Sequence, residues 1–193
     1  MEASRPTTTR SSLRADARRN RERVLAVARA RLDAGDLTLQ LNDIAREAGL
    51  GVGTVYRHFP TRRALVEALA INPLELLLHR AREASTIHDP WDALAFFVRA
   101  IVFLQLADIG IAEVLIAPED ETPLVAAMKQ DLHRKAQHLL DRAHTAQVVR
   151  AEIALDDLQR LVCGIEHAVR IGPARDAATA TLYTDLLLAG IRA

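Results

Sequence analysis

The sequence predicts an all-helical protein of about nine helices, and three observations support this fold class. Half of the 193 residues are hydrophobic, but only 4% are aromatic. Ala, Leu, Arg, Glu and Asp are abundant, and unbranched side chains lose little rotamer freedom in a helix. Apolar residues recur at helical spacing, and no segment indicates a sheet.

The composition also argues against two classes of protein. No uninterrupted apolar run approaches the roughly 20 residues that cross a bilayer, and the N-terminal arginines are not followed by a hydrophobic stretch. We therefore expect a cytoplasmic protein with no membrane partner. The single Cys163 has no partner for an internal disulfide, and its apolar neighbours indicate a core residue.

The net charge of zero conceals an asymmetry along the chain. Residues 1–65 contain 13 Lys+Arg against 7 Asp+Glu, whereas residues 66–193 contain 12 against 18. A basic first third predicts a polyanionic partner for that part alone, although chance clustering of surface charge is an alternative. Residues 1–14 are polar without an apolar period and are expected to form a mobile arm, whose arginines either contact DNA or have no role.

The helices of the first third are marked by their ends. A helix beginning at Asp16 is expected to end at Gly35, because glycine is favoured just after a helix. Short helices are predicted over 41–47 and 52–58. Thr61 then suits the N-cap of a fourth helix.

Residues 40–59 have the pattern of a helix-turn-helix. This motif needs a small residue where its helices touch, a turn residue that tolerates positive φ, and an apolar residue that fixes the second helix on the first. Ala45, Gly49 and Val55 supply these three roles at the right offsets.

The second helix of this motif carries side chains suited to DNA. Gly53 permits close approach of the backbone, and Thr54 can meet a base or a phosphate. Arg57 lies about one turn further along the helix, and its guanidinium group can donate to guanine O6 and N7. Val52 offers only apolar contact, for example with a thymine methyl.

The segment 53–62, Gly-Thr-Val-Tyr-Arg-His-Phe-Pro-Thr-Arg, closely resembles the recognition helix of the tetracycline-repressor (TetR) family and its exit into the fourth helix. The resemblance is sharp over about residues 20–70. It implies that Tyr56 and His58 hold phosphates and that Arg62 contacts the DNA backbone. The alternatives are that Tyr56 packs under the first helix and that Arg62 is merely solvated.

The chain departs from the family pattern at the starts of both helices of the motif. Gly51 stands where the family often has Ser, and Leu41 stands where it often has Thr or Ser. Glycine is the weaker cap. The cap of the 41–47 helix falls to Gln40 or Asn42, and its phosphate contact is left open.

The rest of the chain predicts a helical bundle. Asn72-Pro73 is expected to kink or break a helix that starts near 61, because an internal proline removes a backbone hydrogen bond. A further helix over 74–85 would follow the break. The remaining helices are predicted over 90–107, 109–116, 123–146, 155–171 and 175–191.

The resemblance implies three regions: a basic arm over 1–14, a helix-turn-helix domain over 15–62, and a ligand-binding and dimerisation domain over 63–193. Paired recognition helices must lie about 34–36 Å apart to enter successive major grooves, so a homodimer is expected. In the family the last two helices, here 156–171 and 175–191, form the dimer.

The helix over 90–107 is apolar nearly all round, which marks a buried central helix. The family lines its ligand cavity with this helix, so Arg99 is a candidate for an anionic or carbonyl group of a ligand. Arg99 paired with an acidic residue, or in solvent, is the alternative. His167 belongs to a polar cluster with Glu166 and Arg170. This cluster either reaches a cavity or the dimer interface, or forms a purely structural network. The other candidate ligand contacts are Phe96, Ala100, Phe103, Met128 and His167.

These observations predict a sequence-specific regulator of transcription that binds a double-stranded DNA operator as a repressor and is released by an unidentified small molecule. A DNA-binding protein of the same fold without an inducer is the alternative. A small helical enzyme is a distant alternative, because Gly51-Val52-Gly53 is too short to form a phosphate-binding loop. No catalytic residue, cofactor or metal site is predicted, because histidines 133, 138 and 144 are not three or four apart.

Overall fold

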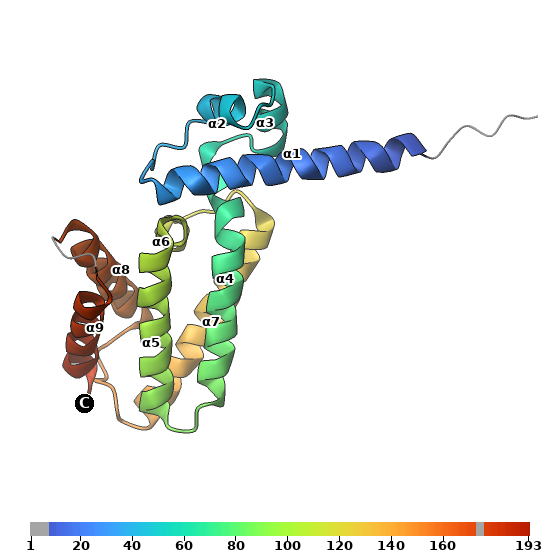
Figure 1. The fold of residues 1–193 in the computed structure, drawn as a ribbon. Helices are drawn as coiled ribbons and strands as arrows, with labels where there is room; N and C mark the ends of the chain where they lie inside the picture. The colour runs from blue at the N-terminus through green and yellow to red at the C-terminus, as the bar shows by residue number, and fades with distance from the viewer. Residues whose placement is uncertain (1–7, 173–175) are drawn as a thin grey trace, which may run out of the picture. The chain divides into compact units, whose positions relative to one another are not determined.

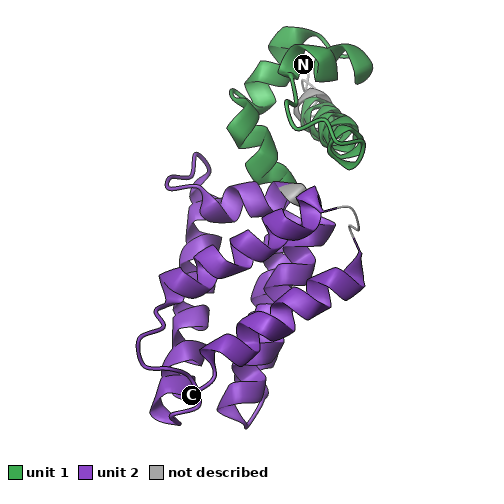
Figure 2. Cartoon of the chain, turned by 90° about the vertical axis from the view of Figure 1, so that its left-hand side faces the viewer, with its two compact units in different colours: residues 1–69 green, residues 70–193 purple. Residues whose placement is uncertain are grey.

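The computed structural model describes residues 8–172 and 176–193, and within these ranges it contains nine helices and no strand (Figure 1). The predicted all-helical class is confirmed. The chain divides into two compact units, residues 1–69 and 70–193, which Figure 2 shows in different colours.

The first unit is built on a long helix. α1 (Thr8–Asp33) contacts both α2 (Leu41–Glu47) and α3 (Val52–His58), which also contact each other. The first turns of α4 (Arg62–Thr86) complete the unit. Its fully buried side chains include Val24, Ala28, Leu39, Ile44, Val55, Phe59 and Leu65.

α1 begins eight residues before the predicted start at Asp16, so residues 8–14 of the expected arm are helical. The described side chains of this first part, from Ser12 to Arg14, are exposed, and a helix that buries nothing has no apolar period to reveal it. The rest of the expected arm, residues 1–7, lies outside the described residues.

α4 is continuous through Pro73, so the predicted break is wrong. Proline has no backbone N–H, and the carbonyl that would accept it in a helix belongs to Leu69, four residues earlier. The guanidinium of Arg29 donates to this carbonyl, with an Nη2–O distance of 2.7 Å. This hydrogen bond replaces the missing one.

The second unit surrounds one central helix. α5 contacts α6, α7, α8 and α9 (Figure 1). By length and composition α5 is the one described helix that could cross a membrane, but these contacts are those of a core helix. The five helices are α5 (Pro90–Ala107), α6 (Ile109–Ile116), α7 (Pro123–Thr145), α8 (Leu155–Ile171) and α9 (Ala177–Ile191). The predicted start of the last helix, residue 175, lies outside the described residues.

Aspartates fix where three of these helices begin. Asp89 accepts a hydrogen bond from the backbone N–H of Asp92 at 2.9 Å, and Asp108 accepts one from that of Gly110 at 2.9 Å. Asp176 caps α9 in the same way. A carboxylate at a helix N-terminus satisfies free N–H groups and also complements the helix dipole.

Candidate DNA-binding helix and ligand cavity

The crossing of α2 and α3 has the three features that the sequence predicts. Ala45 and Val55 are fully buried, and Gly49 has a φ of +62° in the turn between the helices. A Cβ on Gly49 would lie 3.0 Å from Nη2 of Arg23, whose guanidinium donates to the carbonyl of Ala48. The turn therefore needs glycine for its backbone and for the space beside it.

The opposite face of α3 is open to solvent. Val52, Gly53 and Arg57 are exposed, and Tyr56 is 43% exposed. Arg57 forms no hydrogen bond or ion pair with any residue that the structure describes. Thr54 and His58 are half-buried at the edge of this face. The structure brings these six predicted DNA-contacting residues together on one short helix; whether they touch DNA stays a prediction.

The loop before α2 is held from two sides. Asp36 accepts hydrogen bonds from the backbone N–H and the hydroxyl of Thr38, at 2.9 and 2.6 Å. These hydrogen bonds are the main reason why the pKa of Asp36 falls to about 2. They support Leu39, which is fully buried at a φ of +43°.

Arg62 holds the same loop from α4. Its guanidinium donates to the carbonyls of Leu37 and Thr38, with Nη2–O and Nε–O distances of 2.6 and 3.1 Å. Arg62 is thus a structural link and not merely solvated; its predicted contact with the DNA backbone stays a prediction. The N-cap position of α2 is Gln40, but its side chain makes no capping hydrogen bond.

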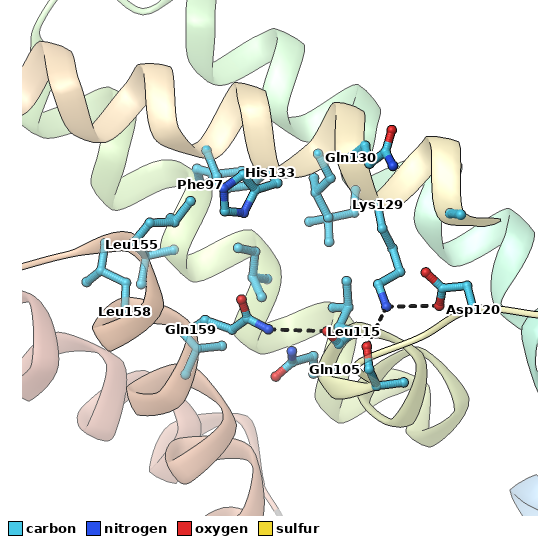
Figure 3. A pocket seen from close by; sticks show the side chains of 18 of the residues that line it. Phe97, Gln105, Leu115, Asp120, Lys129, Gln130, His133, Leu155, Leu158 and Gln159 are labelled. Carbon is cyan, nitrogen blue, oxygen red and sulfur yellow. Dashed lines mark hydrogen bonds and ion pairs between the residues drawn. The ribbon is translucent and has the colours of Figure 1, made fainter. Parts of the chain in front are cut away.

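The second unit contains a cavity of about 410 Å³ lined by α4 to α8 and the loop after α6 (Figure 3). A ligand site of ordinary size occupies roughly 300–1,000 Å³ and is mostly apolar. The apolar lining includes Leu77, Leu94, Phe97, Val98, Ile101, Leu132, Leu158 and Val162.

Three polar side chains of the lining are already paired. Nζ of Lys129 lies 2.9 Å from a carboxylate oxygen of Asp120 and 2.9 Å from the carbonyl oxygen of Ala117 (Figure 3). The side chains of Lys129 and Asp120 are only 17% and 9% exposed. Gln159 donates from Nε2 to the carbonyl of Leu115 at 3.2 Å.

A fourth polar side chain of the lining, Gln105 of α5, is 2% exposed. Its side chain hydrogen-bonds the Cys163 thiol, but its Oε1 has no hydrogen-bond partner. Burial is nonetheless the larger influence on Cys163 and raises the pKa of the thiol.

The residues that the resemblance suggested for ligand binding lie elsewhere. Phe96, Arg99, Ala100 and Phe103 line a second, open groove on another face of α5, and none of them lines the cavity. Arg99 forms an ion pair with Asp185 of α9 at 3.0 Å, which is the alternative left open by the sequence. Met128 is buried and His167 is exposed, and neither lines the cavity or this groove.

Two family models match the chain. A model of bacterial regulatory proteins of the tetR family matches residues 25–69, and a model of the C-terminal domain of SbtR-like transcriptional regulators matches residues 89–193, more than half of the chain. The chain belongs to the TetR family. It is a TetR-family transcriptional regulator with a DNA-binding helix-turn-helix.

Similarity to individual regulators agrees with this assignment. An HTH-type transcriptional regulator of Staphylococcus aureus (strain USA300) is 34% identical over 67 residues, which are 34% of this chain and 36% of that protein. The chain thus matches about a third of the length of this curated relative. The crystal structure of a TetR transcriptional regulator from Streptomyces coelicolor is 31% identical, with a TM-score of 0.52, and the match covers 89% of this chain and 98% of that one.

A more distant likeness shows the fold alone. The ketosteroid transcriptional regulator KstR2 of Mycobacterium tuberculosis is 22% identical, with a TM-score of 0.62, over 90% of this chain and 95% of that chain.

The polar cluster of α8 in this TetR-family chain is structural in part. Glu166 is buried and pairs with Arg170 at 3.1 Å, and burial raises the pKa of its carboxyl. His167 is exposed. Among residues 8–172 and 176–193, no group of three His, Cys, Asp or Glu residues could hold a metal ion.

Proposed function

We propose that this regulator is a homodimeric repressor that binds operator DNA through α3, releases it when a small molecule enters the cavity, and has no enzymatic activity. The observation that carries the proposal is the exposed face of α3 above a fully buried Val55. A recognition helix that enters a major groove is packed against the protein on one face and exposes polar side chains on the other. Because its partner is DNA, we infer that the protein acts in the cytoplasm.

Arg57 is the residue we assign to base recognition. It is exposed, it lacks an internal partner among the described residues, and its guanidinium can donate two parallel hydrogen bonds to guanine. Tyr56, His58 and Thr54 would hold phosphates beside it, and contacts to phosphates give affinity without sequence choice. Gly53 keeps the backbone close to DNA, and Val52 would meet a thymine methyl.

Selection of binding sites from random DNA tests this assignment. We expect Arg57→Ala to relax the preference at one operator position, with a loss of about 1–3 kcal/mol of discrimination there. Tyr56→Phe removes only a hydroxyl and should weaken every sequence alike. Arg134→Ala, which removes an exposed arginine from α7, is the control. An Arg57→Ala protein with an unchanged sequence preference would show that another residue reads the bases.

The dimer is supported by apolar side chains that the single chain leaves exposed on its last two helices: Leu161 and Ile171 of α8, and Leu182 and Leu186 of α9. Gly164 and Gly190 have open space where a Cβ would stand, so another helix can come close there. We expect Leu186→Glu to shift the protein to monomers in sedimentation equilibrium. Leu124→Glu changes another exposed leucine, on α7, and should leave the dimer intact.

The cavity favours a regulator with an inducer over one of the same fold without it. A ligand shifts the protein toward a form that does not bind DNA only if it binds the two forms unequally. We assign ligand contact to the cavity lining, with Phe97, Ile101 and Gln105 on α5, in place of the groove residues Phe96, Arg99, Ala100 and Phe103.

A further inference from the structure

We infer that the cavity binds an uncharged, largely apolar molecule of about two fused rings that donates one hydrogen bond to Oε1 of Gln105. This inference rests on the proposed sensing function. Three features of the cavity support it: the acceptor Oε1 of Gln105 has no partner among the described residues, the charged side chains of the lining pair with each other, and the volume suits such a molecule.

The position of Gln105 defines the polar contact. Its side chain is almost fully buried on the cavity face of α5, and its amide lies beside the Cys163 thiol. That leaves Oε1, which has no partner, as the acceptor available to a molecule in the cavity. A buried acceptor without a hydrogen bond is unfavourable, so a ligand with a hydroxyl or N–H beside Gln105 gains affinity by satisfying it.

The charges of the lining argue against an ionic ligand. Lys129 and Asp120 are both largely buried and neutralise each other, and Lys129 also holds the carbonyl of Ala117. His133, also part of the lining, is exposed and keeps its contact with water. A carboxylate or ammonium group in the buried part beside Gln105 would lose its hydration without gaining a free counter-ion, which is strongly unfavourable.

The size of the ligand follows from the cavity. A buried apolar cavity of about 150 Å³ holds a benzene molecule. The cavity here is about 410 Å³ and is walled mainly by Leu, Val, Ile and Phe side chains. It therefore has room for two fused rings with a substituent.

The test uses the full-length protein and four probes of equal ring size: naphthalene, 2-naphthol, 2-methoxynaphthalene and 2-naphthoate. Calorimetric titration should show 2-naphthol binding about three- to ten-fold more tightly than naphthalene, the gain expected from one net hydrogen bond. The ether has no donor and should bind no better than naphthalene. The naphthoate anion should bind more weakly than either.

Two variants locate the contact. Gln105→Met keeps the length of the side chain without its acceptor, so it should bind naphthalene as the wild type does and lose the preference for 2-naphthol. Gln137→Met changes a glutamine of α7 that does not line the cavity and should keep that preference. Should Gln105→Met not fold, the comparison of 2-naphthol with its methyl ether on the wild type still decides the point.

The proposal is overturned if Gln105→Met keeps the preference for 2-naphthol over naphthalene, or if the ether binds as well as 2-naphthol. It is also overturned if naphthoate binds most tightly or if the wild type binds no probe. The proposed function fails in a different way. If 2-naphthol occupies the cavity with the expected Gln105 dependence but the protein keeps its full affinity for operator DNA, the ligand class is supported and release by such a ligand is refuted.

Discussion

The hydrogen bond between Arg29 and Leu69 should be energetically coupled to Pro73. Arg29→Met keeps an unbranched apolar side chain but removes the donor, which leaves the carbonyl of Leu69 without its 2.7 Å partner. Hydrogen bonds to charged groups contribute about 1.5–3 kcal/mol, so the variant should lose about that much free energy of unfolding. With Pro73→Ala, the new backbone N–H donates to the same carbonyl, and losing Arg29 should cost less.

A double-mutant cycle measures this coupling. Urea unfolding of the wild type, Arg29→Met, Pro73→Ala and the double variant, followed by circular dichroism, should give an interaction free energy of about 1–2 kcal/mol. Any other interaction of Arg29 contributes in both backgrounds and cancels. Additive effects of the two substitutions would refute our explanation of why α4 continues through its proline.

Two further predictions concern the helix-turn-helix unit. Gly49→Ala should cost about 1–2 kcal/mol, because its positive φ disfavours a side chain and the new Cβ would lie close to Arg23. Gly53→Ala, at a helical position with open space around it, is the control and should not destabilise the fold in urea unfolding. The folded-state pKa of Asp36 is lowered to about 2, so its carboxylate stabilises the fold above its ordinary value of 3.8 and loses this effect as the pH falls toward 2. Wild type should therefore melt at a higher temperature than Asp36→Asn at pH 7, with the gap closing between about pH 4 and pH 2; a gap of constant size would contradict this assignment.

Local signals in the sequence were sufficient for the helix-turn-helix. Ala45, Gly49 and Val55 lie at the offsets that two short helices and the turn between them require, and the predicted bounds of α2 and α3 agree with the structure. Thr61 caps α4 as predicted, since its hydroxyl accepts from the N–H of Ala64 at 2.9 Å. Such features depend on spacing along the chain, which is what a sequence displays.

Distant contacts account for what the sequence did not reveal. The continuity of α4 depends on Arg29, which is 40 residues from Leu69. The cavity face of α5 was not predictable because this helix is apolar nearly all round, so Phe96 and Phe97 look alike although only Phe97 lines the cavity. The one available signal for Gln105 was that it is the only uncharged polar residue of α5.

Because the ion pair of the cavity is internal, ionic strength should affect the two proposed activities, DNA binding and ligand binding, differently. Operator affinity falls steeply as salt rises, because cations released from phosphates return to the DNA. Lys129 and Asp120 are paired and largely shielded within the protein, and salt screens such charges far less than exposed ones. An uncharged ligand would then occupy the cavity equally in dilute and concentrated salt, so raising the salt concentration in a binding assay should release DNA without changing how much of the proposed ligand is bound.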